Sequence, residues 1–305
     1  MKKVEGAYTA LVTPFDHEGE IDFDGLSTLV EKQLEGKIDG LVPCGTTGEA
    51  STMTIQEQLS VIAHVAKVVD GKVPVIAGTG TNDTKKTVEY TQKVSEIKGV
   101  NAALVVVPYY NKPNQEGMIY HFETVARYGK LPVVLYNIPG RSVVSMSVDS
   151  VAHLAADPNI IAIKEATGNM VYATQILERC PSFSLLSGDD FTTFPLLAIG
   201  GSGCISVVSN LLPSVMSIMV ESVKNGDLGA GRLAHMRIQK LARALFAEPN
   251  PAPTKAAASI LDWFGDTVRG PLLTCSEDAI NDVRLALEHV NLLQREEDDD
   301  DVHYP

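Results

Sequence analysis

The chain has 305 residues, of which 45% are hydrophobic, so it can bury a large core in one domain with an appendage or in two domains. Its formal net charge of −13 argues against nucleic acid and anionic membranes as main partners, since both are negatively charged. The four cysteines are widely spaced without a CxxC pair, and no window has the length of a transmembrane helix or the pattern of a signal peptide. We therefore expect reduced thiols and a cytoplasmic protein.

Short apolar runs alternate with segments of helical spacing over the first two thirds of the chain. The expected strands are residues 7–12, 38–43, 73–77, 102–107, 131–136, 159–163, 183–187 and 203–207. Between them lie segments such as 22–35 and 54–69, whose apolar residues recur at intervals of three and four. This alternation indicates βα units and a parallel sheet, and eight strands within about 200 residues match a (β/α)8 TIM barrel. The alternative, a doubly wound open sheet, would carry a glycine-rich phosphate loop after its first strand, where residues 13–20 are TPFDHEGE.

No further strand is expected after residue 208. Four segments have helical patterns, at 210–224, 227–247, 252–264 and 276–293, and the proline-rich sequence EPNPAPT interrupts them at 248–254. We expect a barrel domain over 1–224, whose eighth helix is the first of these segments, and a C-terminal helical subdomain over 225–293. Residues 294–305 are expected to form an acidic, disordered tail, because six adjacent carboxylates repel one another and bury nothing.

Lys164 follows the apolar run 160–163, which is typical of a strand buried on both faces. We expect its amine to lie at the mouth of an apolar channel, where burial penalises the ammonium and lowers the pKa. A neutral amine in such a place can form a Schiff base with a carbonyl substrate. Taken alone, such a residue is more often a strand-end lysine that extends to solvent, and the rest of the chain reverses this interpretation.

Polar clusters follow five of the expected strands, and barrel active sites lie at these strand ends. The clusters are GTTGE at 45–49, PYYNKP at 108–113, YNIPGR at 136–141, KEATG at 164–168 and GDD at 188–190. In GTTGE, paired hydroxyls and backbone N–H groups at a helix N-terminus would make a cradle for a carboxylate. The same sequence could be an ordinary strand-to-helix turn with threonine as the helix cap. A keto acid would fit the cradle with its carbonyl toward Lys164.

Tyr136 and Lys164 have inward parity on neighbouring strands, and Ala162 leaves room beneath the lysine. A phenol beside an imine nitrogen can transfer protons, although a tyrosine that lines the barrel and bonds to backbone is the other interpretation. Arg141 suits a second carboxylate on the substrate, or else is a surface charge. The seven histidines form no HxH, HxxxH or HExxH cluster, so we expect no catalytic metal.

The motifs GTTGE, PYYNKP, YNIPGR, IAIKEATG and SGDD occur in an order and spacing that resemble a known superfamily. It comprises the pyruvate-dependent Schiff-base aldolases of the dihydrodipicolinate synthase and N-acetylneuraminate lyase type, and the resemblance extends over about residues 4–293. Within it the dihydrodipicolinate synthase family is most similar, because the sialic-acid lyases generally lack the arginine of YNIPGR. This resemblance implies condensation of pyruvate with L-aspartate 4-semialdehyde, giving 4-hydroxy-tetrahydrodipicolinate for lysine and diaminopimelate biosynthesis. The imine supplies the electron sink, so neither metal nor organic cofactor is implied.

The resemblance also implies the residues of the substrate site: Lys164, Tyr136, Thr46, Tyr110, Thr47, Arg141, Ile205 and Gly188. Lys164 would form the imine with pyruvate, whose carboxylate Thr46 and Thr47 would hold. Tyr136, Thr46 and Tyr110 would relay protons, with Tyr110 reaching into the site of a neighbouring subunit. The implied assembly is accordingly a homo-oligomer, either a dimer or a tetramer built as a dimer of dimers.

Two further sites of substrate contact follow from the same resemblance. Arg141 would bind the carboxylate of the semialdehyde, and the carbonyl of Ile205 would lie near the lysine, with Gly188 also in the substrate site. N-acetylneuraminate lyase and 2-keto-3-deoxy-sugar-acid aldolase activities are the alternatives, but Arg141 favours an acidic aldehyde over a neutral sugar. A non-catalytic barrel that senses a keto acid would be expected to lack the lysine, tyrosine or threonine, and all of these are present. A metal-dependent aldolase would need a cluster of metal-binding side chains, which the histidine spacing does not provide.

Regulation by lysine is expected to be weak or absent. In lysine-inhibited relatives the allosteric pocket carries histidines and a glutamate at the positions of Ile55, Gln58 and Lys86. Asn82 and Tyr109 are retained, but the charge partner for the amine of the effector is replaced by a cation.

Overall fold

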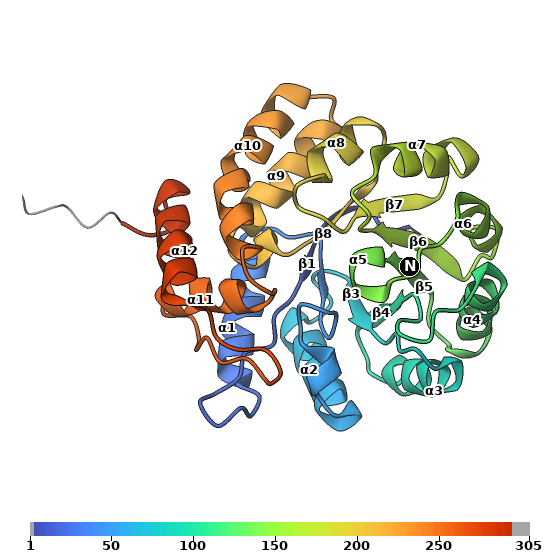
Figure 1. The fold of residues 1–305 in the computed structure, drawn as a ribbon, viewed down its shortest axis with the longest axis horizontal. Helices are drawn as coiled ribbons and strands as arrows, with labels where there is room; N and C mark the ends of the chain where they lie inside the picture. Colours follow the sequence, from blue (N-terminus) through green and yellow to red (C-terminus); the bar gives the residue numbers. More distant parts are fainter. Residues whose placement is uncertain (1–2, 295–305) are drawn as a thin grey trace, which may run out of the picture.

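The computed structural model describes residues 3–294, in which parallel strands close into a barrel in sequence order (Figure 1). The strands are β1 Gly6–Ala10, β2 Gly40–Val42, β3 Val75–Gly78, β4 Val100–Val106, β5 Val133–Asn137, β6 Ile160–Glu165, β7 Ser184–Ser187 and β8 Gly203–Ser206. The ring closes where β8 pairs with β1, with Ile205 opposite Tyr8. All eight expected strands are present with shifted ends, so the predicted (β/α)8 barrel is confirmed.

Helices surround the barrel (Figure 1). They are α1 Phe23–Glu35, α2 Ile55–Val69, α3 Thr84–Ser95, α4 Gln115–Tyr128, α6 Val148–Leu154, α7 Met170–Arg179, α8 Thr193–Ala198 and α9 Pro213–Lys224. Shorter elements interrupt three of the loops, namely the 3-10 helices η1 Ala50–Thr52 and η2 Val208–Asn210 and the one-turn helix α5 Pro139–Ser142. The helices of residues 3–294 are too short or too polar to cross a membrane.

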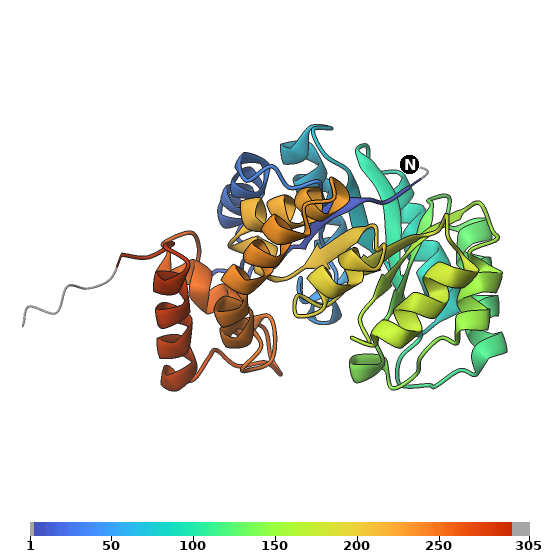
Figure 2. The same cartoon turned by 90° about the horizontal axis from the view of Figure 1, so that it is seen from above.

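Three further helices follow the barrel and extend from one end of the molecule (Figure 2). They are α10 Leu228–Leu245, α11 Ala252–Ile260 and α12 Glu277–His289. The expectation of a helix over 252–264 is wrong at its end, because a turn follows Ile260 and Asp262 adopts a left-handed φ of 56°. The expected acidic tail, residues 294–305, lies outside the described residues apart from residue 294.

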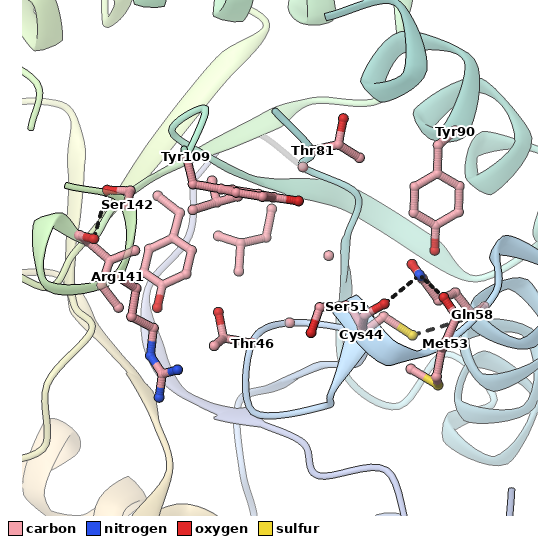
Figure 3. A pocket seen from close by; sticks show the side chains of 18 of the residues that line it. Cys44, Thr46, Ser51, Met53, Gln58, Thr81, Tyr90, Tyr109, Arg141 and Ser142 are labelled. Atoms are coloured by element: carbon pink, nitrogen blue, oxygen red, sulfur yellow. Dashed lines mark hydrogen bonds between the residues drawn. The ribbon is translucent and has the colours of Figure 1, made fainter. Parts of the chain in front are cut away.

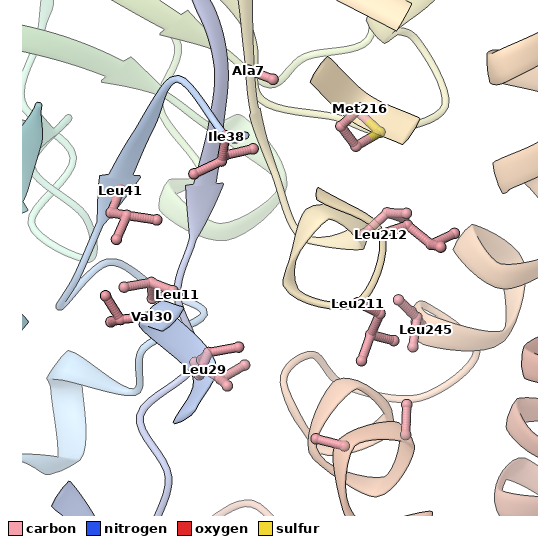
Figure 4. Packing of buried hydrophobic residues seen from close by; sticks show 14 of the residues in the cluster. Ala7, Leu11, Leu29, Val30, Ile38, Leu41, Leu211, Leu212, Met216 and Leu245 are labelled. Carbon is pink, nitrogen blue, oxygen red and sulfur yellow. The ribbon is translucent and has the colours of Figure 1, made fainter. Parts of the chain in front are cut away.

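Two kinds of apolar packing hold the barrel in place. Inside it, Tyr136, Ala162, Leu186 and Ile205 belong to one buried cluster. Outside it, a larger cluster joins β1, β2 and α1 to the C-terminal helices, and Figure 4 shows Leu29 and Leu41 on one side and Leu211, Leu212 and Leu245 on the other. The C-terminal helices therefore share a core with the barrel strands that precede the GTTGE turn.

The start of the GTTGE turn is fixed by close backbone packing. Cys44, which precedes the turn, has a φ of 56°, and the N–H of Gly78 on β3 donates to the carbonyl of Pro43 at 2.9 Å. A Cβ on residue 78 would lie 2.1 Å from the carbonyl oxygen of Cys44, so only glycine permits this approach.

We expect Gly78→Ala to lower the free energy of unfolding by about 1–3 kcal/mol, because the added methyl must push against backbone atoms that cannot move independently. Gly140→Ala is the matched control, since a Cβ there meets no atom within 4 Å and no positive φ is needed. Urea denaturation compares the two variants. Equal stability of both variants would show that the packing at Gly78 is not tight.

Candidate active site

Lys164 and Tyr136 lie side by side inside the barrel. Their Cα atoms are register partners between β6 and β5, and the lysine Nζ is 4.3 Å from the centroid of the tyrosine ring. Both side chains are buried, with exposed fractions of 6% and 4%. The expected juxtaposition is confirmed, although β6 continues to Glu165, so that Lys164 belongs to the strand itself. The amine therefore faces an aromatic surface in a confined space and not bulk water.

The aliphatic part of Lys164 packs against Gly188. A Cβ on residue 188 would lie 2.9 Å from the lysine Cε and 3.0 Å from its Cγ. The N–H of Gly188 also donates to the carbonyl of Glu165 at 2.7 Å, which keeps the loop after β7 close to β6. Because residue 188 has no side chain, the space that the Lys164 side chain occupies inside the barrel stays open.

The GTTGE turn leads only into the three-residue 3-10 helix η1, whose N-cap is Glu49, so the prediction that it lies at the N-terminus of an α-helix is wrong. It forms successive tight turns, in which the N–H of Glu49 donates to the carbonyl of Thr46 at 3.1 Å, and η1 follows. Helix α2 starts only at Ile55, because Thr54 and Glu57 form a complete capping box there. Within residues 3–294, no acceptor takes the backbone N–H of Thr46 or Thr47, so both donors are free for a ligand.

A cavity of about 500 Å³ opens beside this turn (Figure 3). Thr46 and Ser51 lie between its two sides; Tyr109, Arg141 and Ser142 gather on one side, and Cys44, Met53, Gln58 and Tyr90 on the other. Tyr136 also lines the cavity, whereas Thr47, Lys164, Gly188 and Ile205 are not among its lining residues. The Lys164 amine contacts the ring of Tyr136, which lines the cavity, so the amine lies next to the cavity wall.

The two remaining site residues lie toward the outside. Arg141 is in the one-turn helix α5, and its Nη2 donates to the carbonyl of Asn250 at 3.5 Å. Tyr110 is 87% exposed and has a left-handed φ of 73°, so its ring extends into solvent in this single chain. Tyr110 is also not among the residues that line the cavity.

A buried ion pair beneath the turn was not anticipated from the sequence. The Oε1 of Glu49 lies 2.5 Å from the Nζ of Lys255, and the two side chains are 2% and 0% exposed. The other carboxylate oxygen accepts the N–H of Arg269 at 3.0 Å, and Asn250 donates its Nδ2 to the Oγ1 of Thr47 at 2.9 Å. The available signal was that Lys255 is the lone charge among small and apolar residues from 249 to 261, a context that predicts burial.

Burial also governs the titratable groups around the site. It lowers the pKa of Lys255 to about 8, against the opposing effect of the Glu49 carboxylate. It raises the pKa of Glu165, whose Oε1 accepts the N–H of Thr167 at 2.7 Å, and of Asp190, which accepts two backbone N–H groups of the loop after β8. It raises the pKa of the Cys44 thiol as well, so this cysteine is protonated and unreactive at neutral pH.

Comparison with known proteins identifies the relatives of the chain. The model of the dihydrodipicolinate synthetase family matches residues 3–290. The chain belongs to this family. A 4-hydroxy-tetrahydrodipicolinate synthase of Maridesulfovibrio salexigens is 46% identical over 275 residues, which cover 90% of this chain and 94% of the relative.

Two solved structures of dihydrodipicolinate synthases agree with the family assignment. The Acinetobacter baumannii enzyme in complex with pyruvate matches with a TM-score of 0.93 at 36% identity, covering 95% of this chain and 100% of the other. The enzyme of Cyanidioschyzon merolae with lysine bound matches with a TM-score of 0.91 at 39% identity, covering 95% and 99%.

The buried pair predicts a particular dependence of stability on pH. The folded-state pKa of Lys255, about 8, lies below its ordinary value of 10.5, so between these values the unfolded chain binds more protons than the folded chain. This residue therefore makes the free energy of unfolding rise as pH increases from 8 toward 10.5, and below pH 8 it adds no further change.

Comparison with a Glu49→Gln/Lys255→Met variant isolates this contribution from those of other groups. Denaturant unfolding at pH 7, 8, 9 and 10 should show the wild type gaining stability relative to the double variant above pH 8. A difference that is flat or that falls over this range would show that Lys255 keeps its ordinary titration in the folded protein.

Proposed function

We propose that this protein condenses pyruvate with L-aspartate 4-semialdehyde to give 4-hydroxy-tetrahydrodipicolinate, as a cytoplasmic enzyme of lysine and diaminopimelate biosynthesis. The observation that carries the proposal is the buried Lys164 amine, 4.3 Å from the centroid of a Tyr136 ring that lines a cavity together with Thr46 and Arg141. An amine nucleophile, a phenol and a carboxylate-binding turn are the parts that a Schiff-base aldolase needs.

The chemistry follows from these groups. The neutral amine of Lys164 attacks the keto carbon of pyruvate, and loss of water from the carbinolamine leaves an imine. The imine withdraws electrons from the adjacent methyl group, which loses a proton to give an enamine, and the enamine carbon attacks the aldehyde carbon of the second substrate. The amino group of the product then displaces Lys164 as the ring closes. Tyr136 delivers and removes protons at the imine nitrogen in the proposed reaction.

Pyruvate is oriented by its carboxylate. The backbone N–H groups of Thr46 and Thr47, unpaired within residues 3–294, and the hydroxyl of the exposed Thr46 form the cradle, while the Thr47 hydroxyl is already bound to Asn250. Gly188 leaves room for Lys164. We assign the backbone carbonyl of Ile205, a member of the same interior cluster as Tyr136, to the reacting end. The barrel, residues 1–224, carries this chemistry, and residues 225–293 support it as a helical subdomain.

The proton relay is completed by a second copy of the chain. Tyr110 is 87% exposed beside the cavity-lining Tyr109, and its left-handed backbone projects the ring away from its own barrel. In a homodimer, or a tetramer of two such dimers, this ring would reach the Tyr136 and Thr46 of the partner. Arg141 holds the carboxylate of the semialdehyde, for which a guanidinium provides paired donors.

A direct comparison of aldehydes tests the proposed reaction. Pyruvate consumption is measured without added metal, with L-aspartate 4-semialdehyde and with N-acetylmannosamine side by side. Turnover only with the semialdehyde is the expected result. A preference for the sugar would move the protein to the lyase branch of the superfamily and remove the assigned role of Arg141.

We expect Arg141→Ala to raise the KM for the semialdehyde at least tenfold and to change the KM for pyruvate less than threefold, since the lost donors are worth roughly 1.5–3 kcal/mol. Steady-state kinetics with each substrate varied in turn measure both values. Arg141→Lys is the companion variant, because it keeps the charge and loses the paired geometry. Equal losses for the two substrates would assign Arg141 to the fold and not to the aldehyde.

We expect L-lysine at low millimolar concentration to leave the rate nearly unchanged. The amide of Gln58 donates to the carbonyls of Ala50 and Met53, Ile55 is apolar, and Lys86 adds a positive charge near where the amine of lysine would bind. Asn82 and Tyr109 alone supply no countercharge. Initial rates with and without L-lysine, at subsaturating pyruvate, measure the effect, and a clear decrease would contradict the expectation.

A further inference from the structure

The GTTGE turn ends in a residue with a strained backbone and a buried charge. Glu49 has φ 54° and ψ 35°, a left-handed conformation that is costly for a residue with a side chain. Glycine would relieve this strain, yet the position holds a glutamate whose carboxylate is buried against Lys255 and the N–H of Arg269. The carboxylate of Glu49, which glycine would lack, must therefore contribute through these two contacts.

The partner of Glu49 comes from the C-terminal helices. Lys255 lies on α11, is fully buried, and donates to the carbonyl of Thr267 at 2.8 Å, while its ammonium lies 4.0 Å from the centroid of the Phe15 ring. The Arg269 guanidinium packs on the same ring at 4.4 Å and pairs with the carboxylate of Glu57 on α2 at 2.6 Å. Segments from both ends of the chain thus meet under the turn.

These contacts hold one side of the turn and leave its other side open. Besides the contacts of Glu49, Thr13 donates its hydroxyl to the carbonyl of Gly48 at 2.7 Å, and Asn250 binds the hydroxyl of Thr47. The N–H groups of Thr46 and Thr47, which are free within residues 3–294, belong to residues only three and two positions before Glu49. A shift of the Glu49 side chain would therefore move the two donors.

We propose that the buried Glu49–Lys255 pair positions the Thr46–Thr47 turn, so that the C-terminal helical subdomain sets the affinity of the barrel for pyruvate. This inference rests on the proposed function, because it takes the carboxylate of pyruvate as the ligand of the turn. The pair touches neither substrate. Its role is to keep two N–H donors and a hydroxyl aimed at one carboxylate, an arrangement that loses affinity when the donors move by a fraction of an ångström.

The test compares substrates in a variant from which both charges are removed. Replacing one partner would leave an unpaired buried charge and could unfold the protein, so the variant is Glu49→Gln/Lys255→Met, which keeps the size of both side chains. We expect its KM for pyruvate to rise at least tenfold and its KM for the semialdehyde to change less than threefold. Circular dichroism and the thermal midpoint verify that the variant is folded at the assay temperature.

Glu57→Gln is the matched control. It removes an ion pair that ties the same C-terminal segment to the barrel, while glutamine can keep the capping contact at the start of α2. We expect this variant to lose thermal stability with its KM for pyruvate within a factor of two of the wild type. A similar rise in both variants would show that general loosening, and not the Glu49–Lys255 pair, changes the affinity.

Other outcomes separate this inference from the proposed function. A folded double variant with the wild-type KM for pyruvate would overturn the positioning role and leave the aldolase intact. Wild-type protein that consumes no pyruvate with the semialdehyde would instead overturn the proposed function itself. Equal rises in KM for both substrates would assign the pair to the whole site and would contradict its link to the turn.

Discussion

The register between β5 and β6 places Tyr136 directly beside Lys164 in the interior of the barrel. A slip of one residue in either strand would turn its side chain to the outer face, where helices cover the strands, so closure of the ring holds the pair in position. The contact between Tyr136 and Lys164 also depends on small neighbouring residues, since Gly188 leaves space for the lysine side chain and Ala162, which is buried, has only a methyl group beneath it. The position of the amine, on which the proposed chemistry depends, is therefore a property of the sheet.

The GTTGE turn has a different kind of support. It lies on a loop, and its conformation is maintained by contacts from residues far away in sequence: Thr13 after β1, Asn250 before α11, Lys255 on α11 and Arg269 beyond it. The same cluster of apolar residues joins the C-terminal helices to β1 and β2. The C-terminal helices thus contact one strand end of the barrel, and these contacts are the basis for the proposed positioning of the two N–H donors.

Sequence patterns predicted the parts of this structure that depend on periodicity. Parity along each apolar run was sufficient to pair Tyr136 with Lys164, and the strand ends marked the polar residues of the rim. Local turn geometry was less accessible: the capping box at Thr54 starts α2 later than the GTTGE motif suggested, and Arg141 lies in a helical turn. The Glu49–Lys255 pair joins residues about 200 positions apart, so periodicity and local motifs could not reveal it.

The most direct test of the account is the identity of the residue that binds pyruvate. The protein is incubated with pyruvate and sodium borohydride, which reduces an imine to a stable secondary amine, and its peptides are mapped by mass spectrometry. One adduct is expected, on the peptide that contains Lys164, and none is expected in Lys164→Ala. An adduct on Lys255 or another lysine, or no adduct on the wild type, would contradict this expectation.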